Sequence, residues 1–114
     1  MSQSSELPIQ IDVQTVSEML KQGDDFLLLD VREPNEYAVA KITGSTLLPL
    51  SEIGARVHEL EEHKDRLIVV HCHHGGRSLQ VTEALRSRGF DKVQNMDGGI
   101  DVWSQQIDPS VNRY

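Results

Sequence analysis

One short stretch of the sequence holds most of the residues that could do chemistry. It contains Cys72, the only cysteine in the chain, followed by His73, His74, Gly75, Gly76, Arg77 and Ser78. An apolar run at residues 67–70 precedes the cysteine, and apolar residues at helical spacing follow the serine. A thiol between a strand and a helix is a candidate nucleophile, a candidate metal ligand or a buried structural residue.

Several features of this loop favour the reactive thiolate form of Cys72. The N-terminus of the following helix directs unpaired N–H groups and a positive dipole end towards the loop. Gly75 and Gly76 let the backbone curl, so that successive N–H groups can converge on one anion. Arg77 adds a permanent cation, and the two histidines add charge that depends on pH. We therefore interpret Cys72 as a nucleophile rather than a structural residue.

Two other kinds of chemistry fit the loop less well. Adjacent residues at a strand end point in different directions, and the sequence has no second cluster of ligands, so we expect no bound metal. Cysteine-dependent phosphatases and arsenate reductases also use a cysteine-to-arginine loop. Theirs is one residue longer than the stretch between Cys72 and Arg77, and the shorter loop suits a single sulfur atom better than a phosphate.

The composition limits the class of protein. The chain has 114 residues, enough for one domain with a core. Its net charge of -7 argues against nucleic acid and anionic membranes as partners. A single cysteine fits a reducing compartment, and neither a secretory signal nor a long apolar run is visible, so we expect a cytoplasmic protein.

The apolar pattern predicts a three-layer α/β/α domain with a mainly parallel, five-stranded sheet. Residues 26–31 and 67–70 are continuous apolar runs, typical of strands buried on both faces. We expect shorter strands at residues 9–11, 46–50 and 92–96. We expect helices after Asp12, at residues 33–39, from Ser51 to Leu60, from Ser78 to Gly89 and at residues 98–107, with Asp12, Ser51 and Ser78 as N-caps. Residues 1–8 and 108–114 are predicted tails on a domain at residues 9–107.

Four segments in order resemble the single-domain rhodanese family of sulfurtransferases. They are LLLDVREPNEY, KITGSTLLPL, VVHCHHGGRS and MDGGIDVW, and the similarity runs from about Ile9 to Gln106. The second segment departs from the family pattern, with Lys41 where histidine is common and Thr43 where proline is common. The active loop has two histidines where thiosulfate-preferring members often carry extra arginine or lysine, which leaves the donor open.

The resemblance implies a rhodanese fold and covalent catalysis without a cofactor. Cys72 would attack the outer sulfur of a donor and keep it as a persulfide. The loop from His73 through Gly75 and Gly76 to Ser78, with the side chain of Arg77, would bind the donor and the persulfide. Asp30 and Arg32 would brace the loop, and for Arg32 an ordinary strand-end ion pair is an equal alternative.

The resemblance also implies partners. The donor would be thiosulfate or a similar small molecule, as in a thiosulfate:cyanide sulfurtransferase. The acceptor would be cyanide or a thiol, including thioredoxin or a sulfur-relay protein. The alternative is a non-enzymatic module, either regulatory or a persulfide carrier that a partner protein loads.

Overall fold

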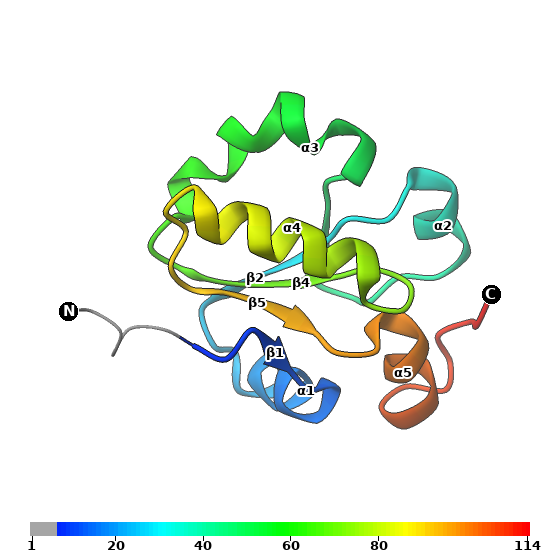
Figure 1. Cartoon of the computed structure of the whole chain (residues 1–114). Coiled ribbons are helices and arrows are strands. Elements are labelled where there is room, and N and C mark those ends of the chain that lie inside the picture. The colour runs from blue at the N-terminus through cyan, green and yellow to red at the C-terminus, as the bar shows by residue number, and fades with distance from the viewer. Residues whose placement is uncertain (1–6) are drawn as a thin grey trace.

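The computed structural model describes residues 7–114 and contains a five-stranded sheet between two layers of helices (Figure 1). All neighbouring strands are parallel, in the order β1-β5-β4-β2-β3. The strands are β1 (Gln10–Ile11), β2 (Phe26–Asp30), β3 (Thr46–Leu47), β4 (Leu67–His71) and β5 (Val93–Met96). The helices are α1 (Val13–Gln22), α2 (Pro34–Val39), α3 (Leu50–Arg56), the 3₁₀ helix η2 (Val57–His63), α4 (Gly76–Ser87) and α5 (Gly99–Gln106). The predicted fold class is confirmed.

The central strand β4 is apolar because helices cover both faces of the sheet. Ile68 and Val70 pack into the core cluster beneath α3, η2 and α4, whereas Val69 packs into the cluster beneath α1 and α5. Successive side chains of a strand point to opposite faces, so a strand covered on both sides carries no polar face. By the same alternation, Cys72 lies in the α4 cluster and is 1% exposed.

The carboxyl ends of the strands meet α2 and the N-terminal ends of α4 and α5 at one edge of the sheet (Figure 1). Connections in a parallel sheet return over its faces, so the loops that leave this edge lie close together in space. Across residues 7–114, no helix is both long enough and apolar enough to cross a membrane.

Two of the three predicted helix caps are wrong. Asp12 does cap α1, because its carboxylate accepts a hydrogen bond from the N–H of Thr15. The expected helix from Ser51 to Leu60 instead begins at Leu50 and changes to 3₁₀ geometry at Val57. Apolar side chains three or four residues apart fit either helix, so their spacing could not separate the two.

Ser78 lies inside α4 rather than at its N-cap. The helix begins at Gly76, and Gly75 is the N-cap residue, with φ 113°. This left-handed conformation suits glycine and turns the chain sharply from the cysteine loop into the helix. The Ser78 side chain is therefore free to face Cys72 instead of capping the helix.

The segments predicted as tails contact the domain wherever the structure describes them. Residues 1–6, most of the predicted N-terminal tail, lie outside the described residues. The carbonyl oxygens of Leu7 and Pro8 accept hydrogen bonds from Arg86. After α5, Val111 is buried in the α5 core cluster, and the chain then returns to the carboxyl edge of the sheet.

The N-terminus of α5 packs directly on the cysteine loop. The N–H of Ile100 donates to the Cys72 carbonyl at 2.9 Å, and the N–H of Asp101 donates to the His73 carbonyl at 3.1 Å. Gly99 has φ 61°, and a Cβ there would lie 2.5 Å from both of these carbonyl oxygens. Only glycine allows this approach of helix and loop.

Gly99→Ala should therefore lower the free energy of unfolding by about 2 kcal/mol or more, because both the space and the backbone conformation exclude a methyl group. Chemical denaturation measures this change. Gly54→Ala is the matched control: a Cβ at Gly54 in α3 meets no atom within 4 Å, so this helical substitution should be neutral or slightly stabilising. Equal effects of the two substitutions would contradict the packing argument.

Candidate active site

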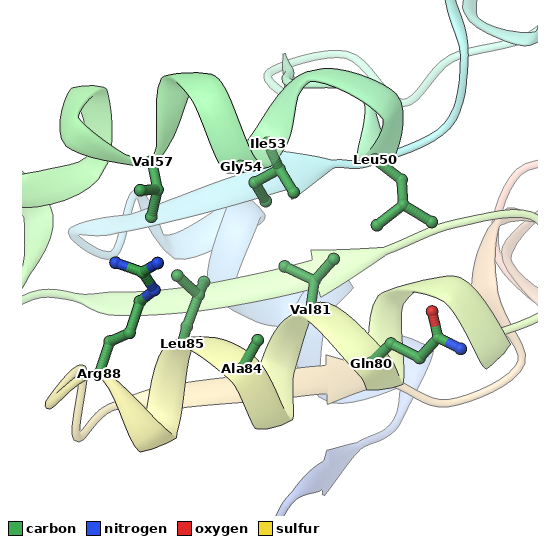
Figure 2. A pocket seen from close by; sticks show the side chains of 9 residues that line it. All are labelled: Leu50, Ile53, Gly54, Val57, Gln80, Val81, Ala84, Leu85 and Arg88. Carbon is green, nitrogen blue, oxygen red and sulfur yellow. The ribbon is translucent and has the colours of Figure 1, made fainter.

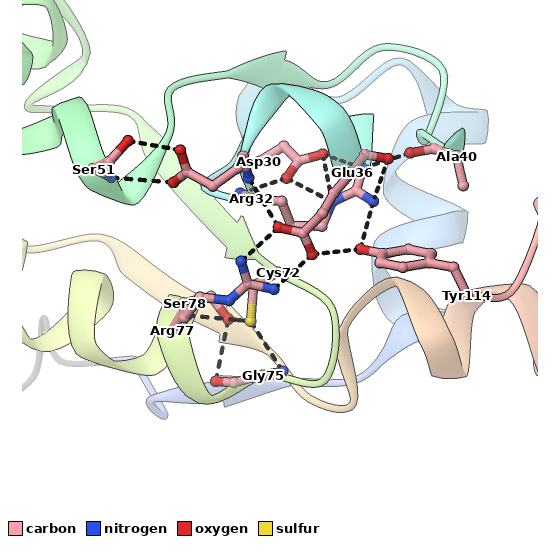
Figure 3. A network of polar contacts seen from close by, with 11 residues as sticks. Asp30, Arg32, Glu36, Ala40, Ser51, Cys72, Gly75, Arg77, Ser78 and Tyr114 are labelled. Atoms are coloured by element: carbon pink, nitrogen blue, oxygen red, sulfur yellow. Dashed lines mark hydrogen bonds and ion pairs between the residues drawn. The ribbon is translucent and has the colours of Figure 1, made fainter. Parts of the chain in front are cut away.

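Backbone and side-chain donors converge on the sulfur atom of Cys72 (Figure 3). The N–H of Gly75 lies 3.1 Å from Sγ, the N–H of Ser78 lies 3.4 Å away, and the Ser78 hydroxyl lies 3.3 Å away. These donors come from the loop and the first turn of α4, whose dipole has its positive end here. Donors aimed at one sulfur stabilise negative charge on it, or on a second sulfur bonded to it.

The Ser78 hydroxyl has three neighbours but only one hydrogen to donate. Besides Cys72 Sγ, it contacts the Gly75 carbonyl at 3.2 Å and Oδ1 of Asn95 at 2.5 Å. Asn95, at the end of β5, also donates to the Gly75 carbonyl at 3.3 Å. Asn95 therefore fixes the serine and the loop together, and the serine can turn its hydrogen towards the sulfur when charge appears there.

Arg77 is paired with a carboxylate from another element. Its two terminal nitrogens donate to Oε1 and Oε2 of Glu36, in α2, at 2.7 and 2.8 Å (Figure 3). Arg77 holds the pKa of Glu36 at about 2, so this carboxylate is ionised throughout the neutral range. The predicted cation is present next to Cys72, already paired with an anion.

The two histidines of the loop stack on each other, and His73 also stacks on Tyr114. The His73 ring lies 3.9 Å from that of His74 and 3.9 Å from that of Tyr114. Burial lowers the pKa of His73, and the neighbouring His74 lowers it further. His73 therefore adds less positive charge at neutral pH than its residue type suggested.

Asp30 and Arg32 form a fully buried ion pair, with Nη2 of Arg32 2.7 Å from Oδ2 of Asp30. Arg32 also donates to the carbonyls of Glu36 and Ala40 and to the hydroxyl of Tyr114. Its contacts hold α2 and the segment after α5. No hydrogen bond joins it to residues 72–78 among the described residues, and bracing of the loop by Asp30 and Arg32 stays a prediction.

Of the residues predicted for the site, the structure places Cys72, Gly75 and Ser78 in direct contact. Gly76 begins α4, and within residues 7–114 its N–H makes no hydrogen bond to the sulfur. Three polar partners of the site were not predicted from the sequence: Glu36, Asn95 and Tyr114. Glu36 lies in the LLLDVREPNEY segment, and the resemblance of that segment to the rhodanese family could have indicated a role at the site.

A separate cavity of about 260 Å³ lies between α3 and α4 (Figure 2). Its lining is mainly apolar: Leu50, Ile53, Gly54, Val57, Gln80, Val81, Ala84, Leu85 and Arg88. None of residues 72–78 lines it, so it does not belong to the candidate site.

The sequence of the whole domain matches one family model. A model of the Rhodanese-like domain matches residues 12–106. The chain belongs to the rhodanese family. A protein of *Allochromatium vinosum* named Sulfurtransferase is 36% identical over 102 residues, which cover 90% of this chain and 94% of that relative. The rhodanese family and this relative support sulfur transfer as the general activity.

Other rhodanese relatives place the domain in longer chains or share its fold. The chloroplastic Rhodanese-like/PpiC domain-containing protein 12 of *Arabidopsis thaliana* is 40% identical over 95 residues, 80% of this chain. The match spans only 31% of that plant protein. The crystal structure of a rhodanese-related protein from *Thermoplasma volcanium* covers 94% of this chain and 100% of its own, with a TM-score of 0.79 and 31% identity.

His71, directly before Cys72, is fully buried, and neither of its ring nitrogens has a hydrogen-bond partner among the described residues. Its Nε2 lies 4.0 Å from Oδ2 of Asp30. Burial lowers the pKa of His71 to about 4, despite the attraction of that carboxylate. The rhodanese core therefore holds a neutral imidazole beneath the cysteine.

This burial predicts a loss of stability in mild acid. Unfolded His71 takes up a proton near pH 6.5, whereas the folded form stays neutral down to about pH 4. The free energy of unfolding should therefore fall by up to about 3 kcal/mol as the pH drops between these values. Denaturation at a series of pH values measures this slope. A His71→Leu variant retains the other titrating groups and should lose the part of this pH dependence that His71 contributes. Identical slopes in the two proteins would show that His71 takes up a proton freely in the folded state.

Proposed function

We propose that this rhodanese domain is a sulfurtransferase in which Cys72 carries the transferred sulfur as a persulfide. The observation that supports this most directly is the convergence of the Gly75 and Ser78 N–H groups on Sγ. Such donors suit a sulfur atom that gains negative charge when a donor is cleaved or an acceptor attacks. The four residues between Cys72 and Arg77, one fewer than in cysteine-dependent phosphatases, also suit a single sulfur atom better than a tetrahedral phosphate.

In the loading step, the Cys72 thiolate attacks the outer sulfur of a donor. With thiosulfate, the S–S bond of the donor breaks, a new S–S bond forms on Sγ, and sulfite leaves with the bonding electrons. In the second step, a thiophilic acceptor attacks the outer sulfur and releases the Cys72 thiolate. Cyanide would give thiocyanate; a thiol, thioredoxin or a sulfur-relay protein would give a new persulfide.

The single cysteine supports transfer to a separate acceptor. No second thiol is present in these 114 residues, so the persulfide cannot close an internal disulfide. Its sulfur then leaves only to a molecule that reaches Cys72. A reducing compartment such as the cytoplasm would keep Cys72 available for a further cycle.

A second candidate function, a persulfide carrier loaded by a partner protein, is favoured by the enclosure of the thiol. Cys72 is 1% exposed, and Arg77 beside it is occupied by Glu36. A partner that docks at the carboxyl edge of the sheet could open these contacts in a way that a small donor cannot. Rapid loading from a cysteine desulfurase combined with slow loading from small donors would favour the carrier; equally slow loading from both would exclude it.

Loading can be observed directly by intact-mass spectrometry of the reduced protein after brief incubation with thiosulfate. We expect a gain of one sulfur atom that cyanide removes, because the loop stabilises the persulfide on Cys72. Cys72→Ser, which keeps a hydroxyl in place of the thiol, should gain none. A Cys72 thiol that remains unmodified by thiosulfate, other sulfane donors and a protein persulfide would contradict the proposal.

A further inference from the structure

Glu36 pairs with both terminal nitrogens of Arg77, the only residue of the cysteine loop that is charged at every working pH. Arg77 presents its two terminal nitrogens to the two oxygens of this carboxylate at 2.7 and 2.8 Å. A bidentate pair of this kind uses the same fork that would grip a sulfonate or another oxyanion. An anionic donor that seeks Arg77 therefore competes with Glu36.

The carboxylate is held in this position from two further directions (Figure 3). The N–H of Glu33 donates to its Oε1 at 3.0 Å, as part of the capping box of α2. The hydroxyl of Tyr114 donates to its Oε2 at 3.0 Å while it accepts from Nη1 of Arg32 at 2.8 Å. The Tyr114 ring is fixed in turn by its stacking on His73. Displacing Glu36 from Arg77 thus also disturbs the cap of α2 and the contact with Tyr114.

Glu36 places a negative charge against Arg77 in the cysteine loop and so compensates the charge that would attract an anionic donor. Its side chain is only 15% exposed, so water screens it less than it would screen a surface carboxylate. A second negative charge brought close to Glu36 in this setting is disfavoured, whereas an uncharged tail of the donor is not. Donors that differ in the charge of the leaving group should therefore differ in rate.

We propose that Glu36, held by Tyr114, is a specificity-determining residue that makes this site disfavour small dianionic sulfane donors and favour alkyl or protein persulfides with an uncharged tail. This inference rests on the proposed sulfurtransferase function and names its donor class. The persulfide reaction is balanced: the Cys72 thiolate attacks the outer sulfur of RSS⁻, the S–S bond of the donor breaks, and RS⁻ leaves with the electron pair. The outer sulfur stays on Cys72 with its negative charge.

The test compares two donors in Glu36→Gln and in the unchanged protein. The donors are thiosulfate and the hydrodisulfide of 2-mercaptoethanol, and the readout is the second-order rate of sulfur gain by intact mass. Glutamine keeps an oxygen for the Glu33 N–H but removes the charge. The thiosulfate rate should rise about tenfold. The hydrodisulfide rate should change by less than about twofold, so the ratio of the two rates shifts.

Two further variants separate specificity from folding. Tyr114→Phe keeps the ring on His73 but removes the hydroxyl that holds Glu36, and should shift the ratio in the same direction by a smaller factor. Glu52→Gln removes an exposed carboxylate of α3 that pairs with Arg56, and should leave the ratio unchanged. Equal changes in both rates in Glu36→Gln and Tyr114→Phe would overturn the specificity role. If the protein without substitutions gains no sulfur from these two donors or from a protein persulfide, the proposed function on which the inference rests is refuted instead.

Discussion

The arrangement of the site depends on the two hydrogen bonds that dock the N-terminus of α5 on the cysteine loop. The carbonyls of Cys72 and His73 are directed to the N–H groups of Ile100 and Asp101. With these carbonyls occupied, the loop that follows can turn its own N–H groups inward to the sulfur. Two helix N-termini therefore act on one short loop: α5 binds its carbonyls, and α4 faces its thiol.

A second, buried layer of polar contacts fixes what surrounds the sulfur. The Asp30–Arg32 pair has no exposed side-chain surface, and such a pair is tolerated only when its remaining donors are satisfied. Arg32 meets this condition through the carbonyls of Glu36 and Ala40 and the hydroxyl of Tyr114. Arg32 forms the ion pair that was one of the two interpretations of the sequence, and bracing of the loop stays a prediction. Its other donors hold α2, and α2 carries the carboxylate that meets Arg77.

The features that local sequence controls could be predicted. Continuous apolar runs identified β2 and β4, because a strand buried on both faces needs such a run. The position of Cys72 after a strand and the curl of the backbone at Gly75 and Gly76 were also predicted, whereas the N-cap role of Gly75 was not. The change from the α-helix α3 to the 3₁₀ helix η2 could not be predicted, because apolar side chains have similar spacing in both kinds of helix.

The polar partners of the loop could not be predicted, because they depend on how whole elements face each other. Arg77 and Glu36 are 41 residues apart, and Tyr114 is 78 residues from Glu36. Nothing in their local sequence sets the direction of α2 or the path of the chain after α5. In the sequence, Asn95 cannot be distinguished from an ordinary strand residue. Its amide meets Ser78 only because the sheet places β5 beside β4.

The donors of the loop after β4 suit a second sulfur atom bonded to Cys72, as the proposed persulfide requires. The most direct test is a crystal structure of the protein after sulfur loading. We expect density for one additional sulfur on Sγ, with the outer sulfur within hydrogen-bonding distance of the N–H groups at Gly75 to Ser78. A loaded sulfur that points away from these groups, or a loop that must unfold from α5 to accommodate it, would contradict the account.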